Sequence, residues 1–427
     1  MIKTYNIKDL SVDEILAREE NAVDVSGIVA GVIDNIRKNG DAALADYTEK
    51  FDKVKLDSIV VTREELDEAT ASLDEDFLNI LRDAAANIEH YHKCQIKQGY
   101  AVTDKEGVIL GQRVTPIEKV GVYVPGGSAP LPSSVLMNII PAKIAGVPFI
   151  AMATPPGPDG KVNPAILAAA DIAGADVIYK MGGSQAIAAL AYGTETVTAV
   201  HKIVGPGNAF VAEAKRQVFG KVGIDMIAGP SEIIVLADGT CDPTVVAADM
   251  LSQAEHDRLA SAILVTDSED LAAKVADELE VQIPLLSRAE IARASIDVYG
   301  KIIITDTFKR AIDMVNELAP EHLEVMVDDP FAVLSEIKNA GSIFLGKNCP
   351  EPLGDYFAGT NHVLPTSGTA KFSSPLSVDD FIKKSSYLYY TREALEKEAR
   401  RVNEFAKREQ LTAHARSAVV RFEKDGK

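Results

Sequence analysis

A carboxylate and an imidazole stand side by side at Glu321 and His322, in the segment Ala-Pro-Glu-His-Leu-Glu. Neighbouring groups of these types can share proton transfers, one acting as the acid and the other as the base. Glutamate directly after proline is also common at the start of a helix, which explains Glu321 about as well. The two residues are therefore a candidate acid/base pair, with a helix start as the alternative interpretation.

Gln253 and His256 form a second candidate group, in the run Asp-Met-Leu-Ser-Gln-Ala-Glu-His that ends at His256. On a helix, residues three positions apart share one face, and this spacing suits two ligands of one metal ion. Glutamine is an uncommon metal ligand, however, and a histidine at a helix end often has a structural role. The spacing alone leaves both interpretations open.

Asp355 and His362 lie in the glycine-bounded segment Gly-Asp-Tyr-Phe-Ala-Gly-Thr-Asn-His, inside an irregular stretch predicted from 347 to 380. Irregular segments of this length within compact domains are typically functional. Together with His256 and His414, Asp355 would supply a carboxylate and two imidazoles, a mixture that suits Zn²⁺. Sequence spacing does not show whether these residues converge.

The remaining histidines and cysteines have structural interpretations. His90 and His92 stand two apart on a predicted helix and point to different sides, which favours surface positions for both. His201 opens a predicted strand. A reactive thiol is conceivable at Cys349, near a polar loop, but no histidine flanks this cysteine, so a structural role is favoured there.

Three glycine clusters each follow a predicted strand and precede a predicted helix, at 125–128, 182–184 and 205–208. Backbone N–H groups in this position can face an anion or a nucleotide, although any one cluster could equally be a tight turn. Three clusters at one sheet edge favour a ligand, since ligands of open α/β folds bind outside the carboxyl ends of the strands. The Gly-x-Gly-x-x-Gly dinucleotide fingerprint and the phosphate-binding Gly-x-x-x-x-Gly-Lys-Ser/Thr pattern are absent from the sequence.

The elements that must position these residues alternate between strands and helices. From about residue 120, short β-branched runs alternate with alanine-rich stretches, the signature of βαβ units on a parallel sheet. The predicted strands are 120–124, 149–153, 177–181, 202–204, 232–236, 261–266, 301–305 and 342–345. Helices are predicted at 134–145, 164–173, 184–192 and 209–219. In the first hundred residues, capping-box spacings at Ser11 and Thr62 and a helix stop at Asn39-Gly40 predict further helices.

The expected fold class is α/β, with two Rossmann-like open parallel-sheet domains without a standard Gly-x-Gly-x-x-Gly, an N-terminal helical segment and a C-terminal helical tail. The expected parts are an N-terminal helical region at 1–110 packing on the second α/β domain, a first Rossmann-like domain at 120–231, a second at 232–375, and the tail at 376–427. Strong turn signals before Ser231 favour two open sheets over the alternative, a (β/α)₈ barrel. The charged tail has few apolar positions to bury on its own domain, so we expect it to pack elsewhere, such as on a second subunit.

The bulk composition excludes several classes of protein. A chain of 427 residues exceeds the size at which one hydrophobic core usually stops growing. Sixty-three acidic against 44 basic residues leave a formal net charge of −19, which disfavours nucleic-acid partners. Three widely spaced cysteines fit a reducing compartment. With no apolar stretch of bilayer-spanning length, we expect a cytoplasmic protein that does not enter a membrane.

Six longer segments contain most of these candidate residues. They are Val-Gly-Val-Tyr-Val-Pro-Gly-Gly from 120, Lys-Ile-Val-Gly-Pro-Gly-Asn from 202, Ile-Ala-Gly-Pro-Ser-Glu from 227, Leu-Ser-Gln-Ala-Glu-His from 251, Ala-Pro-Glu-His-Leu-Glu from 319 and Gly-Asp-Tyr-Phe-Ala-Gly-Thr-Asn-His from 354. Taken together and in this order, they closely resemble the histidinol dehydrogenase family. The resemblance spans nearly the whole chain, and it is far more specific than any single motif above.

The resemblance implies two successive NAD⁺-dependent oxidations, from L-histidinol through an enzyme-held aldehyde to L-histidine, the last reactions of histidine biosynthesis. It implies one Zn²⁺ per subunit, bound by Gln253, His256, Asp355 and His414, which would orient the substrate through its imidazole and amino nitrogens. The positions that match the family's substrate contacts are Ser231, Gln253, His256, His322, Asp355, Glu409 and His414. The positions that match its NAD⁺ contacts are Tyr123, Gln185 and Asn208.

By the same resemblance, His322 would remove the hydroxyl proton while hydride leaves for the nicotinamide, and Glu321 would activate the water that hydrates the aldehyde. The family forms homodimers in which the C-terminal tail crosses to the partner. Glu409 and His414 would then complete the active site of the neighbouring subunit.

Two other functions are weighed against this one. The first is a related zinc- and NAD-dependent dehydrogenase that oxidises another small alcohol on the same scaffold. Glu409 favours histidinol, because the resemblance implies that this residue contacts the amine end of that substrate. The second is a catalytically silent metal-binding or scaffold protein, which the presence of both His322 and Asp355 disfavours.

Overall fold

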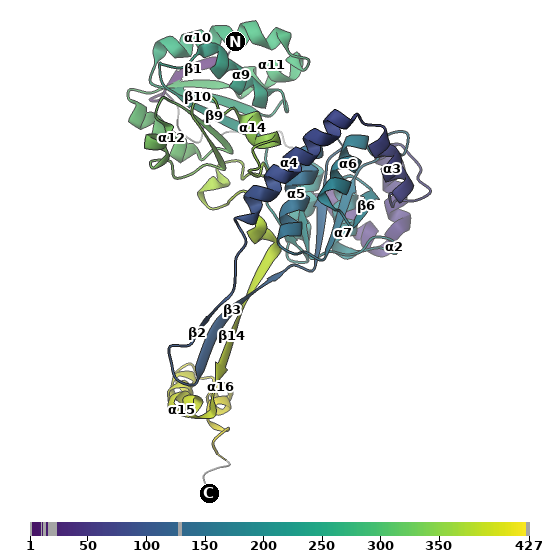
Figure 1. The fold of residues 1–427 in the computed structure, drawn as a ribbon, viewed down its shortest axis with the longest axis vertical. Helices are drawn as coiled ribbons and strands as arrows, with labels where there is room; N and C mark the ends of the chain where they lie inside the picture. The colour runs from purple at the N-terminus through teal and green to yellow at the C-terminus, as the bar shows by residue number, and fades with distance from the viewer. Residues whose placement is uncertain (1, 10, 12–13, 16–23, 127–129, 424–427) are drawn as a thin grey trace. The chain divides into compact units, whose positions relative to one another are not determined.

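The structure is a computed structural model that describes residues 2–9, 11, 14–15, 24–126 and 130–423. The chain forms two compact units, each built from segments far apart in sequence. The first unit contains Met1–Gln95 and Ile117–Phe381, and the second contains Ile96–Pro116 and Ile382–Lys427. The first unit holds two parallel sheets and the second holds an antiparallel sheet with a helical C-terminus, as Figure 1 shows. The predicted α/β class with two parallel sheets is confirmed, and the barrel alternative is wrong.

A five-stranded sheet forms one part of the first unit. In spatial order its parallel strands are β6 (Val177–Lys180), β5 (Phe149–Thr154), β4 (Lys119–Tyr123), β7 (Lys202–Val204) and β8 (Gly223–Ile224). Its helices are α5 (Pro132–Ile144), α6 (Pro164–Ala173), α7 (Gly183–Tyr192) and α8 (Ala209–Val218). Helices cover both faces, so the strands are apolar in nearly every position, which is why the sequence predicted four of the five to within one residue.

The N-terminal helices α2 (Ser26–Asp52), α3 (Arg63–Ala71) and α4 (Glu75–Lys93) pack on this five-stranded sheet. Helix α2 lies against α7 and α8, and α3 and α4 lie against α5 and α6. The prediction that this region packs on the second α/β domain is therefore wrong for these three helices. Their apolar faces instead close the two cores of the five-stranded sheet. Among the described residues up to 15, β1 (Lys3–Asn6) joins the other sheet, and Ile2, Ile7 and Ile15 are buried in its cores.

The predicted helix stop at Asn39-Gly40 is a kink inside α2. Gly40 has a φ of 50°, outside the helical range, and the helix resumes after it. A side chain at this position would collide with the Glu195 carboxylate, which accepts a hydrogen bond from the Asp41 backbone N–H at 2.8 Å. Glycine is therefore required here both by the backbone conformation and by the close approach of Glu195.

The second parallel sheet of the first unit has six strands. In spatial order they are β1, β11 (Lys301–Ile304), β10 (Ser261–Thr266), β9 (Glu232–Ala237), β12 (His322–Met326) and β13 (Ser342–Leu345). The helices α9 (Pro243–Ala254), α10 (Glu269–Gln282) and α11 (Ala289–Val298) pack on one face, and α12 (Phe308–Leu318) and α13 (Pro330–Leu334) on the other. The sequence predicted β9, β10, β11 and β13, but not β1 or β12.

The second unit corrects the prediction of a purely helical tail. A nine-residue strand, β14 (Ile382–Tyr390), pairs antiparallel with β3 (Val108–Pro116), which also pairs with β2 (Tyr100–Val102). The helices α15 (Arg392–Arg408) and α16 (Thr412–Val419) follow and pack on each other. Residues 96–110, predicted within the helical N-terminal region, therefore contain no helix but β2 and the start of β3, because the partner strand of β3 comes from the opposite end of the chain. No helix in the described part of the chain combines the length and apolar character needed to cross a bilayer.

Candidate functional site

A cavity of about 310 Å³ in the first unit collects six of the predicted site residues. Those six are Ser231, Gln253, His256, Glu321, His322 and Asp355. They come from the loop before β9, the end of α9, the start of β12 and the short helix α14 (Glu351–Tyr356). Loops that follow β4 and β7 of the five-stranded sheet also line the cavity, through Pro125 and Gly205. Cys349 is not among its lining residues, in keeping with the structural role favoured from sequence.

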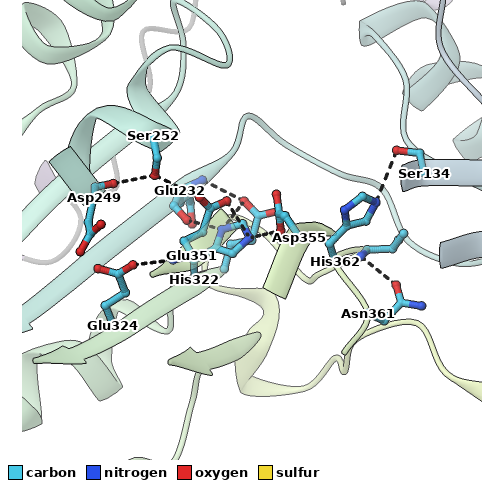
Figure 2. A network of polar contacts seen from close by, with 12 residues as sticks. Ser134, Glu232, Asp249, Ser252, His322, Glu324, Glu351, Asp355, Asn361 and His362 are labelled. Carbon is cyan, nitrogen blue, oxygen red and sulfur yellow. Dashed lines mark hydrogen bonds and ion pairs between the residues drawn. The ribbon is translucent and has the colours of Figure 1, made fainter. Parts of the chain in front are cut away.

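His322 is held in one orientation at the first position of β12. Its Nδ1 lies 2.9 Å from the backbone oxygen of Glu232. Because a carbonyl oxygen only accepts hydrogen bonds, Nδ1 carries the proton, and the neutral imidazole has its lone pair at Nε2. This buried Nε2 has no hydrogen-bond partner among the described residues, and it lies 3.7 Å from Asp355 Oδ1 and 3.8 Å from Glu351 Oε1 (Figure 2). Nε2 is therefore the nitrogen at which the neutral ring can accept a proton.

Three carboxylates control the charge on His322. Burial lowers the pKa of this histidine, but the negative charges of Glu321, Asp355 and Glu351 outweigh burial and raise the pKa to about 10. In these surroundings the imidazole binds a proton tightly, because every close charged neighbour is negative. A cation near Asp355 would offset this charge and make the imidazole a better proton acceptor at neutral pH.

Glu321 precedes β12 and is itself buried. Its Oε2 accepts a hydrogen bond from the Glu232 backbone N–H at 2.8 Å and lies 3.8 Å from His322 Nδ1. Burial raises the pKa of the Glu321 carboxyl to about 8, a value suited to proton exchange near neutral pH. The helix-start interpretation of Pro320-Glu321 is wrong, since the chain enters a strand here.

Gln253, His256 and Asp355 supply the groups that a metal ion would need. Gln253 lies in the last turn of α9 with no exposed surface, and neither atom of its side-chain amide has a hydrogen-bond partner among the described residues. An unpaired buried amide is costly, so a missing ligand is its simplest partner. His256 follows the end of α9, and its ligand atom lies within 4.8 Å of those of Asp355 and Glu351. The residues present therefore fit a metal ion.

Glu351 was missed by the sequence reasoning. It begins α14 after Pro350, which in sequence indicates only an acidic residue at a helix start. In the structure Glu351 is almost fully buried, Ser252 Oγ donates to its Oε2 at 3.0 Å, and its backbone N–H donates to Glu324 Oε1 at 2.7 Å. Burial raises the pKa of the Glu351 carboxyl to about 8. Glu351 thus ties α14, and with it Asp355, to α9 and β12.

Glu324 lies beneath this network and gives the protein a dependence of stability on pH. Burial, and then the nearby Asp249 carboxylate, raise the pKa of Glu324 to about 9. The ordinary pKa of this carboxyl is 4.5, so the folded protein binds its proton more tightly than the unfolded chain does. The stability that this proton contributes is complete below pH 4.5 and is lost as the pH rises through 9. A Glu324→Gln variant keeps an oxygen for the Glu351 N–H and adds no charge. We expect it to be more stable than the parent at pH 9, by on the order of 1–3 kcal/mol, with a smaller gain at pH 6.

Urea unfolding midpoints at the two pH values measure this difference. Glu317→Gln, at an exposed position of α12, is the matched control and should leave the difference between the two pH values unchanged. A Glu324→Gln variant that loses stability equally at pH 6 and pH 9 would show that Glu324 is held there as the ionised form.

Of the two histidines predicted at the surface, His90 is exposed as predicted and His92 is not. His92, predicted at the surface, is fully buried: its Nδ1 lies 2.9 Å from the Ile88 backbone oxygen and its Nε2 lies 3.3 Å from Asn361 Nδ2. His90 and His201 are exposed. His362 lines the cavity, with Nε2 3.4 Å from Ser134 Oγ on α5 (Figure 2), and burial lowers its pKa. The error at His92 arises because its two ring nitrogens find partners that local sequence does not reveal.

The three residues predicted to contact NAD⁺ lie at the carboxyl edge of the five-stranded sheet. Tyr123 ends β4, and its hydroxyl accepts a hydrogen bond from the Gly183 N–H at 3.1 Å. Gln185 is buried in the first turn of α7. Asn208 caps α8, its side-chain oxygen accepting from the backbone N–H groups of Phe210 and Val211. This is the sheet edge at which ligands of open α/β folds gather.

Glu409 and His414 belong to the second unit. Glu409 directly follows α15, and His414 lies on α16. Both side chains are exposed in this single chain. Neither residue is among those that line the cavity of the first unit.

Comparison with known proteins shows that this chain is similar to histidinol dehydrogenases. A family model described as histidinol dehydrogenase matches residues 16–422. A histidinol dehydrogenase of Clostridium acetobutylicum is 57% identical over 404 residues, covering 95% of this chain and 94% of that protein. One of Bacillus subtilis is 56% identical over 393 residues, covering 92% of both. The crystal structure of histidinol dehydrogenase from Elizabethkingia anophelis is similar with a TM-score of 0.94 and 39% identity, covering 100% of this chain and 99% of that one.

Proposed function

Since this chain belongs to the histidinol dehydrogenase family, we propose that the cavity beside His322 is the site where L-histidinol is oxidised to L-histidine through L-histidinaldehyde. The protein is a zinc- and NAD-dependent oxidoreductase of histidine biosynthesis. Each turnover transfers two hydrides, and therefore reduces two NAD⁺. The roles below are proposed for individual residues of this chain.

Gln253, His256, Asp355 and His414 would hold one Zn²⁺ per subunit. The unpaired amide of Gln253 and the close approach of His256 to Asp355 support this set. When bound, zinc supplies a positive charge that offsets the Asp355 carboxylate and a template for the imidazole and amino nitrogens of histidinol. Zinc accepts ligands of these nitrogen and oxygen types.

His322 acts as the base of the first oxidation. Its Nε2 accepts the proton of the substrate hydroxyl while the hydride on the same carbon passes to NAD⁺, which leaves the aldehyde. Because Nδ1 is fixed on the Glu232 carbonyl, only Nε2 can take this proton. This orientation of His322 toward the cavity is the observation that carries the proposal.

Glu321 acts before the second oxidation. It accepts a proton from the water that adds to the aldehyde carbon, and the resulting hydrate loses a hydride to the second NAD⁺ to give the carboxylate of histidine. A buried carboxyl with a pKa of about 8 binds and releases protons readily near neutral pH. The burial of Glu321 and His322 also limits escape of the aldehyde to solvent.

NAD⁺ would lie along the carboxyl edge of the five-stranded sheet, on Tyr123, Gln185 and Asn208. The two parallel sheets are then Rossmann-like without the standard glycine fingerprint. Ser231, which lines the cavity, and Glu409 would complete the contacts to histidinol.

We propose a homodimer with shared active sites, in which the C-terminal tail of each subunit crosses to its partner. Within one chain, the side chains of Glu409 and His414 are exposed. The exposed apolar side chains of the second unit, including Tyr387, Leu388 and Phe405, support a partner for this unit.

The test supplies the purified protein with Zn²⁺, NAD⁺ and L-histidinol and follows NADH and histidine together. We expect about two NADH per histidine, and loss of turnover after removal of the metal with a chelator, restored by added Zn²⁺. Parallel assays with other small primary alcohols test the alternative of a related dehydrogenase. Turnover of another alcohol in preference to histidinol, or one NADH per product, would overturn the assignment.

A further inference from the structure

A buried ion pair, Lys215 with Asp225, lies next to the candidate NAD⁺ positions and has no part in the chemistry described above. Lys215 is on α8 and Asp225 directly follows β8. The two side chains are 3% and 1% exposed, and both residues line the cavity. Buried charges are expensive to keep, so the pair needs a reason beyond filling space, which apolar side chains do at lower cost.

The two side chains form hydrogen bonds with both backbone polar groups of one residue, Gly205. Asp225 Oδ2 accepts a hydrogen bond from the Gly205 N–H at 2.7 Å, and Lys215 Nζ donates to the Gly205 carbonyl at 3.0 Å. Asp225 Oδ1 also accepts from the Met226 N–H at 2.6 Å. The carboxylate and the ammonium are thereby paired with each other and with the backbone at the same time.

Gly205 begins the turn that carries Asn208. Its φ of 114° is rarely adopted by other residues, and a Cβ here would collide with the backbone oxygen of Tyr123. The turn therefore passes directly against the end of β4, where Tyr123 lies. Gly205 has no side chain and Pro206 has no backbone N–H, so neither can anchor the turn in these ways. The two hydrogen bonds to the Gly205 backbone therefore hold the start of this turn.

We propose that Lys215 and Asp225 are positioning residues of the NAD⁺ site. Through Gly205 they hold the Gly205–Asn208 turn in the position in which Tyr123 and Asn208 contact the cofactor. The inference rests on the proposed function, since that function assigns the cofactor to these positions. Neither side chain transfers a proton or contacts the reacting atoms. Their effect passes through the backbone of Gly205 to the placement of NAD⁺.

The test compares Lys215→Met with the double variant Lys215→Met/Asp225→Asn, in the full-length, zinc-loaded enzyme. The single variant leaves a buried carboxylate unpaired, and the double variant removes both charges and so recovers much of the lost thermal stability. We expect both variants to raise the KM for NAD⁺ roughly tenfold or more, since small misplacements of a binding loop have large kinetic effects. The dissociation constant of histidinol, measured by calorimetry without NAD⁺, and the zinc content should stay unchanged.

Lys202→Met is the matched control. Lys202 is the first residue of β7, the strand that leads into Gly205, and its Nζ lies 3.1 Å from Asp380 Oδ1. Lys202→Met therefore also breaks a lysine–aspartate ion pair near the turn, but not one that contacts Gly205. We expect it to lower the melting temperature without raising the KM for NAD⁺. If the double variant folds and its KM for NAD⁺ stays within twofold of the parent, the positioning role is wrong. A parent enzyme that does not oxidise histidinol with NAD⁺ would instead overturn the proposed function, before any variant is compared.

Discussion

Replacing His322 with asparagine is expected to lower kcat for histidinol oxidation by roughly 10²–10⁴-fold and to leave the zinc content unchanged. Asparagine can still donate from its side-chain amide to the Glu232 carbonyl, as His322 Nδ1 does, so the start of β12 should keep its structure. It offers no basic nitrogen in place of Nε2. The loss should appear in kcat more than in the KM for histidinol, because the base acts only as the proton leaves.

Steady-state kinetics and metal analysis of the same preparations measure both effects. His201→Asn, at an exposed histidine before β7 and outside the cavity, is the control and should behave as the parent. If His322→Asn lost zinc and rate to the same extent, His322 would be a residue of the metal site and not the base. The base would then have to be sought among the other cavity residues, with Glu321 first.

A dimer that combines one His322→Asn subunit with one His414→Ala subunit is expected to have about half the activity of the parent dimer, although each variant alone is inactive. If the tail crosses, the first unit of the His414→Ala chain keeps its own His322 and receives an intact His414 from the other chain. One site of the two is then complete. Each homodimer lacks one of these groups in both of its sites.

Co-expression with two different affinity tags gives the mixed dimer in pure form. The matched control places both substitutions in one chain and pairs it with an unsubstituted chain. With crossing tails this control has no complete site and is inactive, whereas with tails that serve their own subunit it keeps about half of the activity. The two dimers thus give opposite results under the two arrangements. An inactive mixed dimer with a half-active control would show that His414 serves its own chain.

Much of the fold could be predicted where local pattern and tertiary environment agree. The strand β10 and the helix α6 have the bounds that the sequence predicted, since one is a short run rich in apolar and β-branched residues and the other an alanine-rich run with proline at its start. The strand β12 was missed because Glu321, His322 and Glu324 interrupt the apolar pattern. These residues are polar where a buried strand should be apolar because they serve the site.

The strand β14 and the packing of the N-terminal helices were mispredicted for another reason. Strand β14 pairs with β3, and Lys384 faces Val114 from the far end of the chain. Pairings between such distant segments depend on the entire fold and leave no local periodicity. An amphipathic helix likewise shows that it has a buried face but not which sheet that face covers.

By itself, the sequence determined the family, the two α/β sheets and the list of residues that could hold zinc, substrate and cofactor, because motifs and apolar runs are local properties. The tertiary structure decided what surrounds Glu321 and His322: a strand start instead of a helix start, a fixed Nδ1, and carboxylates on the Nε2 side. It also added Glu351, Glu324 and the Lys215–Asp225 pair, none of which has a distinctive sequence context. Burial and distance create the chemistry of these groups, and both arise only when segments from ten to 99 residues apart in sequence are packed together.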